Sequence, residues 1–597
     1  MYIFANVHTI SISTKNLMMK YPFKRKIDQL LAKGSGEQLG WLCALTLFII
    51  GIAILVVKLF FIGDDISWED VVGIFIDSGY SLEPGSHYWF RLILAILSTF
   101  VFSALLISVF TNIFDNISES VQNGERRYRL KGHVLVIGKG TSLSNVVRAL
   151  LDRGKTVVVL CGENPELGNE VYYYHGTQTD EADILSARPY DAESIYLLGD
   201  DSNPNHDALN LRALSILKKA VPSSDRKIPC YLSIREQETK EVFHFMKNAS
   251  ETNDCESGLM VNIVDEFEYY AEQLLVGTDF LPVIRPSDDK AARFIIFGSG
   301  QIAVSTALEL AHICHYPSFA RNGRRTVITM IDPEISNCYQ SLLAAHTSLF
   351  GMSHHSFISA NGIKAEYAPE PENDFLDIEW EFVEAGCNNP LSRNIICKAA
   401  ENPYEELRLL VCLEDSHKAV ECALHLPEAS RFASRTALYL NDSTDIVNLA
   451  VSTGMYGDIT IFGLANENIS DPLMDNRLKH GQKVNYIYNK AYVNPPAASP
   501  EEAWYSISEA DKCSSIFCAC ALPLRKSCFD ICSDRMAVYE AEHRRWMMSA
   551  LIMGFKPGPV KDKQKFIHPD IVPFDSLSEE EKEKDKILID AMDYILE

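Results

Sequence analysis

ARFIIFGSGQIAVSTALELAHICHY (residues 292–316) is the stretch that decides the fold class of this chain. It predicts a buried strand, a turn of the form G-x-G-x-x-A and a helix, and the following strand, residues 326–331, ends on an aspartate. Such glycines let phosphate approach the backbone, and the acid can accept ribose hydroxyls. The stretch indicates a nucleotide site, with a purely structural turn as the alternative. The expected binding residues are Gly298, Gly300, Ala303 and Asp332.

The same arrangement occurs earlier, in HVLVIGKGTSLSNVVRALLDRGKTVVVLC (residues 133–161). Gly138 and Gly140 lie at its turn, but the third glycine position is Leu143, and the second strand is followed by Glu163 rather than ending on an acid. Nucleotide binding remains a hypothesis for this copy, in which a structural turn is favoured.

Later segments are duplicated as well. Residues 192–214 and 407–426 each show a buried strand, an acidic pair and a helix. Further strands are expected at residues 230–234, 436–440 and 459–464. Strands that alternate with helices predict an α/β fold with parallel, doubly wound (Rossmann-like) sheets, present in two copies.

Two apolar stretches near the N-terminus are long enough to cross a bilayer. WLCALTLFIIGIAILVVKLFFI (residues 41–62) would span about 33 Å as a helix, and residues 92–114 carry no ionisable side chain. The alternative for each is a buried soluble helix. No later segment has this composition, which leaves about 480 residues on one side of the membrane.

The charges beside these segments predict their direction, because lysine and arginine resist translocation. Basic residues precede the first segment and follow the second, whereas residues 63–90 between the two segments hold only acidic charges. Both termini are therefore expected in the cytoplasm, and the first residues do not read as a signal peptide. The basic residues are Lys15, Lys20, Lys24, Arg25, Lys26, Lys33, Arg126, Arg127, Arg129 and Lys131.

The connection between the two apolar stretches, residues 66–90, has the composition of a re-entrant pore loop. A short helix at residues 66–76 precedes a turn at Asp77-Ser78-Gly79. Irregular backbone at membrane depth must line water or lie within protein, so several copies would have to surround one path. The alternative is a non-conducting external loop. Small or polar residues on one face of the second stretch either line a gate or mediate helix packing: Ala104, Ser108, Thr111 and Asn112.

Together these residues resemble the CASTOR/POLLUX channels, in which a two-span pore precedes tandem RCK (regulator of K⁺ conductance) domains. The filter-like turn, the helix FVFSALLISVFTNIFDNISESVQNG (residues 100–124) and the strand HVLVIG after it carry the resemblance. It implies a homotetramer whose cytoplasmic ring transmits ligand binding to a cation pore. The T-V-G-Y-G filter of potassium channels is absent, so the resemblance implies cation rather than strict K⁺ selectivity. The implied filter residues are Asp77, Ser78, Gly79, Tyr80 and Glu83.

The C-terminal segment, residues 539–596, resembles the small RyR domain of ryanodine receptors and some bacterial proteins. Two helices, at about residues 537–553 and 577–595, would flank a proline-rich loop, with Asp575 or Ser576 capping the second. An aromatic and basic pocket for a nucleotide-like ligand is expected, with tryptophan packing in the core as the alternative. Its residues would be Trp546, Lys561, Lys563 and His568.

Other sequence features argue against further chemistry. The cysteines at residues 513–532 lack the paired knuckles of zinc sites, so most are interpreted as buried, reduced thiols. His312 and His315 are interpreted as packing or solvated residues. With 80 acidic against 55 basic residues the formal charge is −25, which disfavours nucleic-acid binding. No catalytic motif is present, and the chain is expected not to be an enzyme.

The sequence thus predicts a ligand-gated, homotetrameric cation channel of the bacterial inner membrane. NAD(H), ATP/ADP or a signalling nucleotide would be the regulatory ligand, and the partners would be lipid and the chain itself. The alternatives are a membrane-tethered NAD(P)-dependent oxidoreductase and a non-conducting subunit of a cation transporter. The expected divisions are an N-terminal segment 1–40, a pore module 41–114 with its loop 63–90, a connector 115–132, RCK domains 133–290 and 291–485, a linker with the cysteine-rich segment 486–535, and the RyR domain 536–597.

Overall fold

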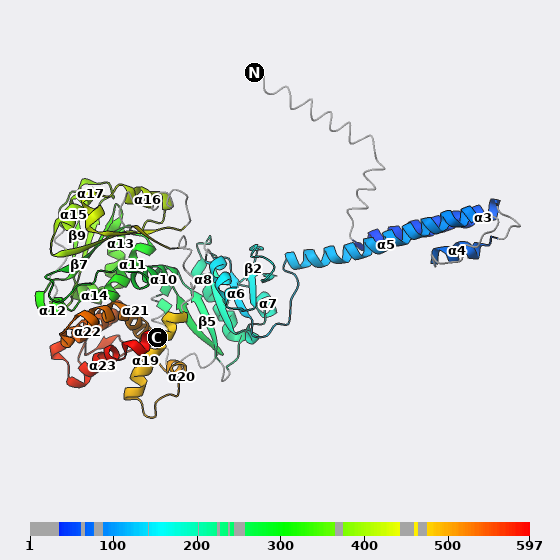
Figure 1. Cartoon of the computed structure of the whole chain (residues 1–597). Helices are drawn as coiled ribbons and strands as arrows, with labels where there is room; N and C mark the ends of the chain where they lie inside the picture. The colour runs from blue at the N-terminus through cyan, green and yellow to red at the C-terminus, as the bar shows by residue number, and fades with distance from the viewer. Residues whose placement is uncertain are drawn as a thin grey trace, which may run out of the picture. The chain divides into compact units, whose positions relative to one another are not determined.

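The structure, a computed structural model, divides into two compact units, residues 1–126 and residues 127–597. Figure 1 colours the chain from blue at the N-terminus to red at the C-terminus. The residues that the structure describes are 35–60, 66–76, 88–140, 142–200, 202–223, 227–236, 239–240, 242–243, 257–364, 374–441, 459–463 and 475–597.

The first unit is helical where it is described. Two long helices, α3 and α5, accompany the short helix α4, whose position agrees with the helix expected at residues 66–76. Ser67 caps α4 by accepting a hydrogen bond from the Asp70 backbone at 3.2 Å, and the Asp70 carboxylate accepts in return from the Ser67 backbone at 2.7 Å. Ser98 of α5 donates to the carbonyl of Ile74 at 3.1 Å and so ties α5 to α4. The helices are α3 (Ser35–Phe60), α4 (Trp68–Ile76) and α5 (Tyr88–Gln122).

Among the described residues, none of the helices combines the length and the apolar character that a bilayer crossing requires. The two membrane segments expected at residues 41–62 and 92–114 remain predictions.

The second unit begins with a six-stranded sheet whose strands are all parallel and lie in the order β3-β2-β1-β4-β5-β6. Its central strands are buried along their whole length, as a sheet covered on both faces requires. The elements are β1 (Val134–Gly138), α6 (Leu143–Asp152), β2 (Val157–Cys161), β3 (Tyr172–His175), α7 (Glu181–Ser186), η1 (Pro189–Asp191), β4 (Ser194–Gly199), α8 (His206–Ala220), β5 (Ile228–Ser233), β6 (Leu259–Val264) and α10 (Glu266–Gly277).

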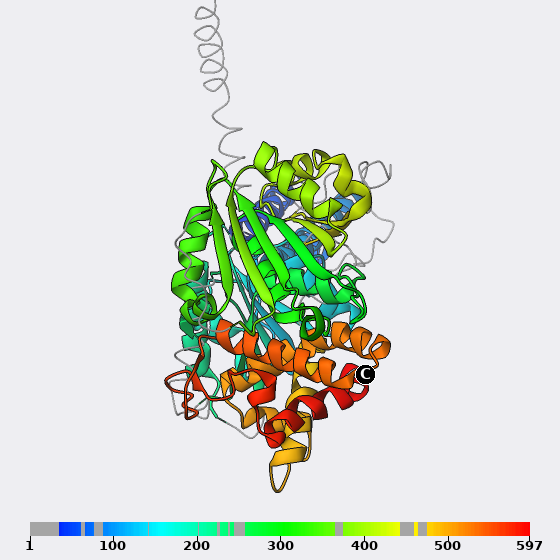
Figure 2. The same ribbon diagram turned by 90° about the vertical axis from the view of Figure 1, so that its left-hand side faces the viewer.

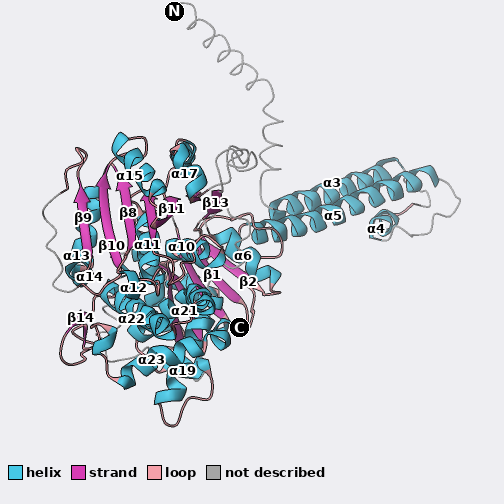
Figure 3. Cartoon of the chain, turned by 60° about the vertical axis from the view of Figure 1, so that its left-hand side comes forward, coloured by secondary structure: helices cyan, strands magenta, loops and turns pink. Residues whose placement is uncertain are grey.

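A seven-stranded parallel sheet follows, in the order β13-β12-β11-β7-β8-β10-β9. Figure 3 shows its strands in magenta with helices beside them. The elements are β7 (Ala291–Phe297), α11 (Gln301–Ile313), α12 (Phe319–Asn322), β8 (Thr326–Asp332), α13 (Ile335–Ala345), α14 (Thr347–Met352), β9 (His354–Ile358), β10 (Ile378–Glu384), α15 (Pro390–Glu401), β11 (Glu405–Val411), α16 (Ser416–Leu424), α17 (Glu428–Ala433), β12 (Arg435–Tyr439) and β13 (Ile459–Phe462).

The two sheets repeat one plan, which confirms the α/β class and the duplication. In both, the first strand of the sheet lies between a strand that follows it closely in the chain and one that comes later: β1 lies between β2 and β4, and β7 between β8 and β11. The strand order reverses at these points. Ligands of open α/β sheets bind beside such reversals, at the carboxyl ends of the strands.

Helices complete the second unit, and Figure 2 shows them in orange and red beside the green second sheet. Met547 and Leu551 of α22 belong to the same apolar core as Phe294 and Trp380 of that sheet. The elements are α19 (Asp475–Tyr492), α20 (Pro500–Tyr505), α21 (Glu509–Ile531), α22 (Arg535–Ile552), β14 (Lys556–Pro557), β15 (Ile567–His568), η3 (Phe574–Ser576), α23 (Glu579–Asp590) and α24 (Met592–Leu596).

The C-terminal region differs from the expectation in three details. The helix α19 runs through the expected boundary at residue 485, and the expected linker contains α20 and α21. The paired strands β14 and β15 interrupt a region expected to be all helical. The predicted cap of the last long helix is wrong: residues 574–576 form a 3₁₀ turn, and Ser578 caps α23 by accepting from the Glu581 backbone.

Candidate functional site

The turn between β7 and α11 is shaped by two glycines. Gly298 has a φ of 125°, and a Cβ there would lie 2.4 Å from the carbonyl oxygen of Cys412, which follows β11. Only glycine therefore lets the ends of β7 and β11 come so close. Gly300 is the N-cap residue of α11 and offers no side chain to its first N–H groups. These amides and the helix dipole form an anion-binding end.

A cavity of about 700 Å³ opens at this turn. Its walls come from both sheets, because the loops after β4 and β5 face the loops after β7, β11 and β12. The volume lies within the range of small-molecule and cofactor sites. The lining residues are Asn203, Pro204, Asn205, His206, Asp207, Ala208, Arg235, Glu236, Thr239, Phe267, Ser299, Gly300, Gln301, Val304, Ser305, Cys338, Ser341, Leu342, Ala345, His346, Glu414 and Asn441.

The first sheet contributes a braced polar wall to this cavity. Asp207 accepts hydrogen bonds from the backbone N–H groups of Arg235 and Glu236, each at 3.0 Å, and lies 2.7 Å from His206 Nδ1. Burial alone would raise the pKa of Asp207, but these hydrogen bonds lower it. The Arg235 guanidinium pairs with Glu266 at 2.9 Å. The wall is thus held in place before any ligand enters.

Glu414 places a carboxylate beside the glycine turn. A Cβ on Gly300 would lie 2.6 Å from its Oε1 atom, so the acid occupies the space next to the helix end where an anion would bind. The residue follows β11, and its carbonyl accepts a hydrogen bond from Asn441. In the sequence, Glu414 belongs to the acidic pair that follows the strand at residues 405–411 and that recurs in the duplicated segment.

The remaining predicted residues of this copy lie near the turn. Ala303 is fully buried, and its methyl group packs 3.5 Å from the Cβ position of Gly298, so that α11 approaches the strand closely. Asp332 ends β8 at the same sheet edge, where the N–H of Gly298 bonds to the Ile331 carbonyl. The Asp332 carboxylate accepts from the Glu334 backbone at 2.8 Å, and the residue is not among those that line the cavity.

The first glycine turn has a different environment. Gly138 has a φ of 111°, and a Cβ there would lie 2.3 Å from the carbonyl oxygen of Gly199, so this glycine allows β1 and β4 to meet. Glu163, the expected ribose acceptor, pairs with Lys139 at 3.3 Å, and this pairing raises the pKa of the lysine. Gly138, Gly140 and Glu163 do not line the 700 Å³ cavity.

The structure brings together part of the predicted C-terminal pocket. The rings of Trp546 and His568 meet edge to face with centroids 4.8 Å apart. Burial, followed by the charge of Lys561, lowers the pKa of His568 to about 4, so its ring is neutral at pH 7. Lys563 is bound by Asp511 of α21 at 2.6 Å. Lys561 and Lys563 line a shallow hollow of about 470 Å³ that does not include Trp546 or His568.

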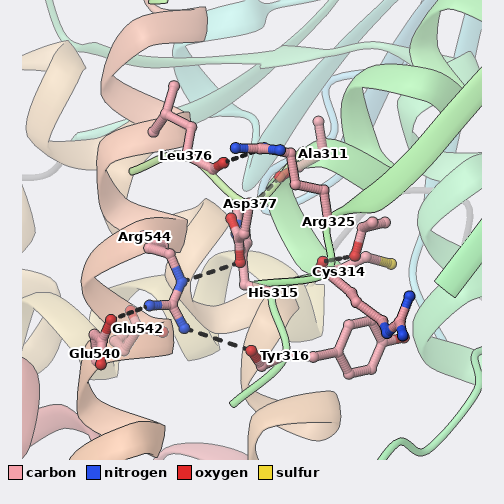
Figure 4. A network of polar contacts seen from close by, with 12 residues as sticks. Ala311, Cys314, His315, Tyr316, Arg325, Leu376, Asp377, Glu540, Glu542 and Arg544 are labelled. Carbon is pink, nitrogen blue, oxygen red and sulfur yellow. Dashed lines mark hydrogen bonds and ion pairs between the residues drawn. The ribbon is translucent and has the colours of Figure 1, made fainter. Parts of the chain in front are cut away.

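The helix α22 is fastened to the second sheet by a buried polar network, shown in Figure 4. Asp377, just before β10, lies 2.7 Å from His315 Nδ1 and accepts from Arg544 Nε at 3.1 Å. Arg525 of α21 donates to the His315 carbonyl. His315 was interpreted as packing or solvated, and the structure gives it this bridging position. His312 packs against Phe517 with ring centroids 4.1 Å apart.

The cysteines of the segment 513–532 lie on or just after α21. Cys518, Cys520, Cys528 and Cys532 are buried and Cys513 is partly buried, and none forms a disulfide. Among the described residues no group of histidine, cysteine and acidic side chains has the arrangement of a metal site.

Of the predicted pore residues, the structure describes those of the gate and not those of the filter. The filter residues Asp77, Ser78, Gly79, Tyr80 and Glu83 lie outside the described residues. The gate residues Ala104, Ser108, Thr111 and Asn112 all lie on α5, and of these only the side chain of Thr111 is described, which is exposed.

Solved structures similar to this chain include a channel, an RCK domain and a gating ring. The GsuK channel bound to NAD matches at 13% identity over 75% of this chain and 85% of that chain, with a TM-score of 0.37. The GsuK RCK domain matches at 13% identity over 61% and 82%, with a TM-score of 0.32. The human SLO3 gating ring matches at 9% identity over 54% and 76%, with a TM-score of 0.34. The sequence matches no protein-family model and no curated protein.

Proposed function

We propose that this chain is a nucleotide-regulated cation channel whose ligand binds at the turn Gly298–Gly300 and controls a pore formed by the first unit. The observation that carries the proposal is the cavity of about 700 Å³ at the strand reversal between β7 and β11. In this proposal the chain acts as a sensor and not as an enzyme.

The chemistry of the cavity suits a nucleotide. The uncapped end of α11 supplies N–H donors and a partial positive charge for phosphate. The carboxylate of Asp332, at the end of β8 and outside the residues that line the cavity, supplies an acceptor for ribose hydroxyls. NAD(H), ATP/ADP or a signalling nucleotide all carry these two groups, and they are the ligand class that we propose.

The position of the cavity between the sheets explains how binding would act on the protein. A ligand held at Gly300 also faces Arg235 and His206 of the first sheet. Its contacts therefore depend on the separation of the two sheets. Binding favours the separation in which both walls touch the ligand, and only such differential affinity can shift a gating equilibrium.

The pore and membrane parts of the proposal rest on the first unit. Its described helices expose large apolar side chains, an arrangement that fits contact with lipid or with other copies of the chain. We propose an inner-membrane homotetramer with cytoplasmic termini, whose loop carboxylates at Asp77 and Glu83 attract cations. The exposed side chains include Leu47, Phe48, Leu59, Phe60, Ile93, Phe100, Phe110 and Phe114.

Nucleotide binding is tested on the purified full chain, first by mass spectrometry of co-purifying small molecules and then by calorimetry with NAD(H), ATP and ADP. Gly300→Ala is the decisive variant. The φ of Gly300 is −75°, which alanine adopts without strain, and the added methyl group fills the turn beside Glu414. We expect at least a tenfold loss of affinity with unchanged folding. Gly351→Ala, where a Cβ meets nothing within 4 Å, is the matched control. Undiminished binding by Gly300→Ala would exclude this site.

The pore is tested separately by cation flux into proteoliposomes. We expect flux that responds to the bound nucleotide and falls in Asp77→Asn. Binding without any flux would instead favour a non-conducting regulatory subunit, and nucleotide-dependent substrate reduction would favour the oxidoreductase.

A further inference from the structure

Two cysteines from separate elements meet near the second glycine turn. Cys387 lies in the turn between β10 and α15, and Cys422 lies in α16. Cys422 is a buried member of an apolar cluster beneath the sheet, and Cys387 packs against the same cluster. Their side chains lie within hydrogen-bonding range of each other. Both are free thiols, Cys422 buried and Cys387 partly exposed.

Hydrogen bonds on both sides of the pair hold the two segments together. Arg393, in the first turns of α15, donates to the carbonyl of His425 at 2.8 Å, three residues after Cys422. Ser392 donates to the carbonyl of Gly386 at 2.8 Å, next to Cys387. The contact between the sulfur atoms is therefore supported by the backbone of each segment.

The two thiols differ in reactivity. The hydrogen bond from Cys422 lowers the pKa of Cys387 to about 7, so that a large fraction is thiolate at neutral pH. The same hydrogen bond, together with burial, raises the pKa of Cys422. Two other thiols show the usual effect of desolvation, which raises the pKa of Cys338 and of Cys412 to about 12. Cys387 has the properties of an attacking thiol, and Cys422 lies where a resolving thiol must be.

We propose that Cys387 and Cys422 form a reversible disulfide with a low-molecular-weight disulfide as the oxidant. The Cys387 thiolate attacks one sulfur of the oxidant, forms a mixed disulfide and releases one thiolate. Cys422 loses its proton to solvent and attacks Cys387 Sγ, which releases the second thiolate. Two protein thiols are thereby oxidised by two electrons, and the oxidant is reduced to two small thiols.

The bond would join two segments that flank the proposed nucleotide site. The N–H of Ala385, two residues before Cys387, bonds to the carbonyl of Asp332 at 3.2 Å. The helix α16 that carries Cys422 begins two residues after Glu414, whose carboxylate lies against Gly300. A disulfide fixes the distance between these flanks, and we expect nucleotide affinity to differ at least threefold between the oxidised and reduced protein. This consequence rests on the proposed function, whereas formation of the disulfide does not.

The test uses the full chain in glutathione buffers of increasing oxidised fraction, followed by trapping with N-ethylmaleimide, tryptic digestion and mass spectrometry. We expect a cross-linked pair of the peptides 365–393 and 419–431, and its loss on reduction. In Cys422→Ala a glutathione adduct should accumulate on Cys387, because no thiol resolves it. Cys397→Ser, on the adjacent helix α15, is the matched control and should leave the cross-link unchanged.

Two results would overturn the proposal. One is separate alkylation of Cys387 and Cys422 in the folded wild-type protein at every buffer composition. The other is a glutathione adduct on Cys387 that persists in the wild type as it does in Cys422→Ala. If the cross-link forms and nucleotide binding is absent, the redox site stands and the proposed function fails.

Discussion

Single side chains decide what the second glycine turn can bind. In the proposed function the turn Gly298–Gly300 holds the phosphates, yet Glu414 adds a negative charge at the same place. The carboxylate is exposed, so it can turn away when a ligand arrives, but its repulsion opposes every anionic group that binds there. If the proposed nucleotide binds at this turn, Glu414 should lower its affinity.

Glu414→Gln should strengthen the binding of ATP and ADP about fivefold at low salt. Removal of one unit charge a few ångströms from the phosphates is worth about 1 kcal/mol when water screens the pair. Calorimetric titration measures the effect, which should shrink as salt is added. Glu401→Gln, an exposed acid at the end of α15, should change the affinity less than twofold. Weaker binding by Glu414→Gln would show that the carboxylate contacts the ligand favourably.

Alkylation of Cys387 by iodoacetamide should accelerate as the pH rises through about 7. The thiolate is the reacting form, and the hydrogen bond from Cys422 lowers the pKa of Cys387 to about 7. Below that pH the rate should fall about tenfold per unit, as the thiolate fraction does. Cys338, whose pKa burial raises to about 12, should stay slow over the same range. Peptide mass spectrometry at timed intervals measures both rates, and equal rates would contradict the assignment.

At the scale of elements, a buried carboxylate links α22 to the second sheet. Asp377 joins His315 from the end of α11 to Arg544 of α22, and all three side chains are buried. Burial alone would raise the pKa of Asp377, but His315 and Arg544 lower it below its usual value. Burial lowers the pKa of His315, so the ring favours its neutral form. The charge of Arg544 is therefore compensated mainly by Asp377 and Glu540.

Asp377→Asn should lower the free energy of unfolding by about 3–5 kcal/mol at pH 7, because it leaves the buried Arg544 charge uncompensated on this side. The folded-state pKa of Asp377 is lowered, so its contribution is present above about pH 4 and is lost as the pH falls through the folded-state value. Denaturant unfolding of the wild type and the variant should therefore converge in acid.

Asp374→Asn is the control for this experiment. Asp374 lies three residues away and pairs with Arg325 and His354, but its side chain is 73% exposed. Its removal should cost less than about 1 kcal/mol at pH 7, as is usual for exposed ion pairs. Equal effects of the two substitutions would mean that the Asp377 network does not hold α22.

At the scale of the whole molecule, the C-terminal helices share an apolar core with the second sheet. Leu524, Met547 and Leu551 of the C-terminal helices pack in one cluster with the second sheet. A smaller cluster between α19, α21, α22 and α23 continues it. Unfolding of the C-terminal helices therefore exposes the sheet.

Residues 127–597 should express as a folded fragment, whereas deletion of residues 536–597 should give an aggregating protein. The deletion exposes apolar side chains of α11 and α14 that α22 covers. Size-exclusion chromatography and thermal unfolding measure both outcomes. A soluble, monodisperse deletion protein with unchanged thermal stability would show that the C-terminal region is an independent domain.

The sequence alone determined the features that depend on local patterns, because strand and helix patterns, turn glycines and caps each involve only a few neighbouring residues. It determined the two parallel α/β copies, the position of Gly298 and Gly300, and the helices on either side of the C-terminal loop. Even there the cap was misplaced by two or three residues, because a 3₁₀ turn at residues 574–576 precedes α23.

Only the tertiary structure decided which turn faces a cavity and what surrounds it. The pairing of Glu163 with Lys139, the approach of Glu414 to Gly300 and the meeting of Cys387 with Cys422 all depend on how strand ends and helices pack. Residues that are distant in the chain carry no local pattern that indicates such contacts. The packing of the whole core sets where a side chain lies against another element. That packing depends on all residues of the chain together, so no short segment of the sequence specifies it.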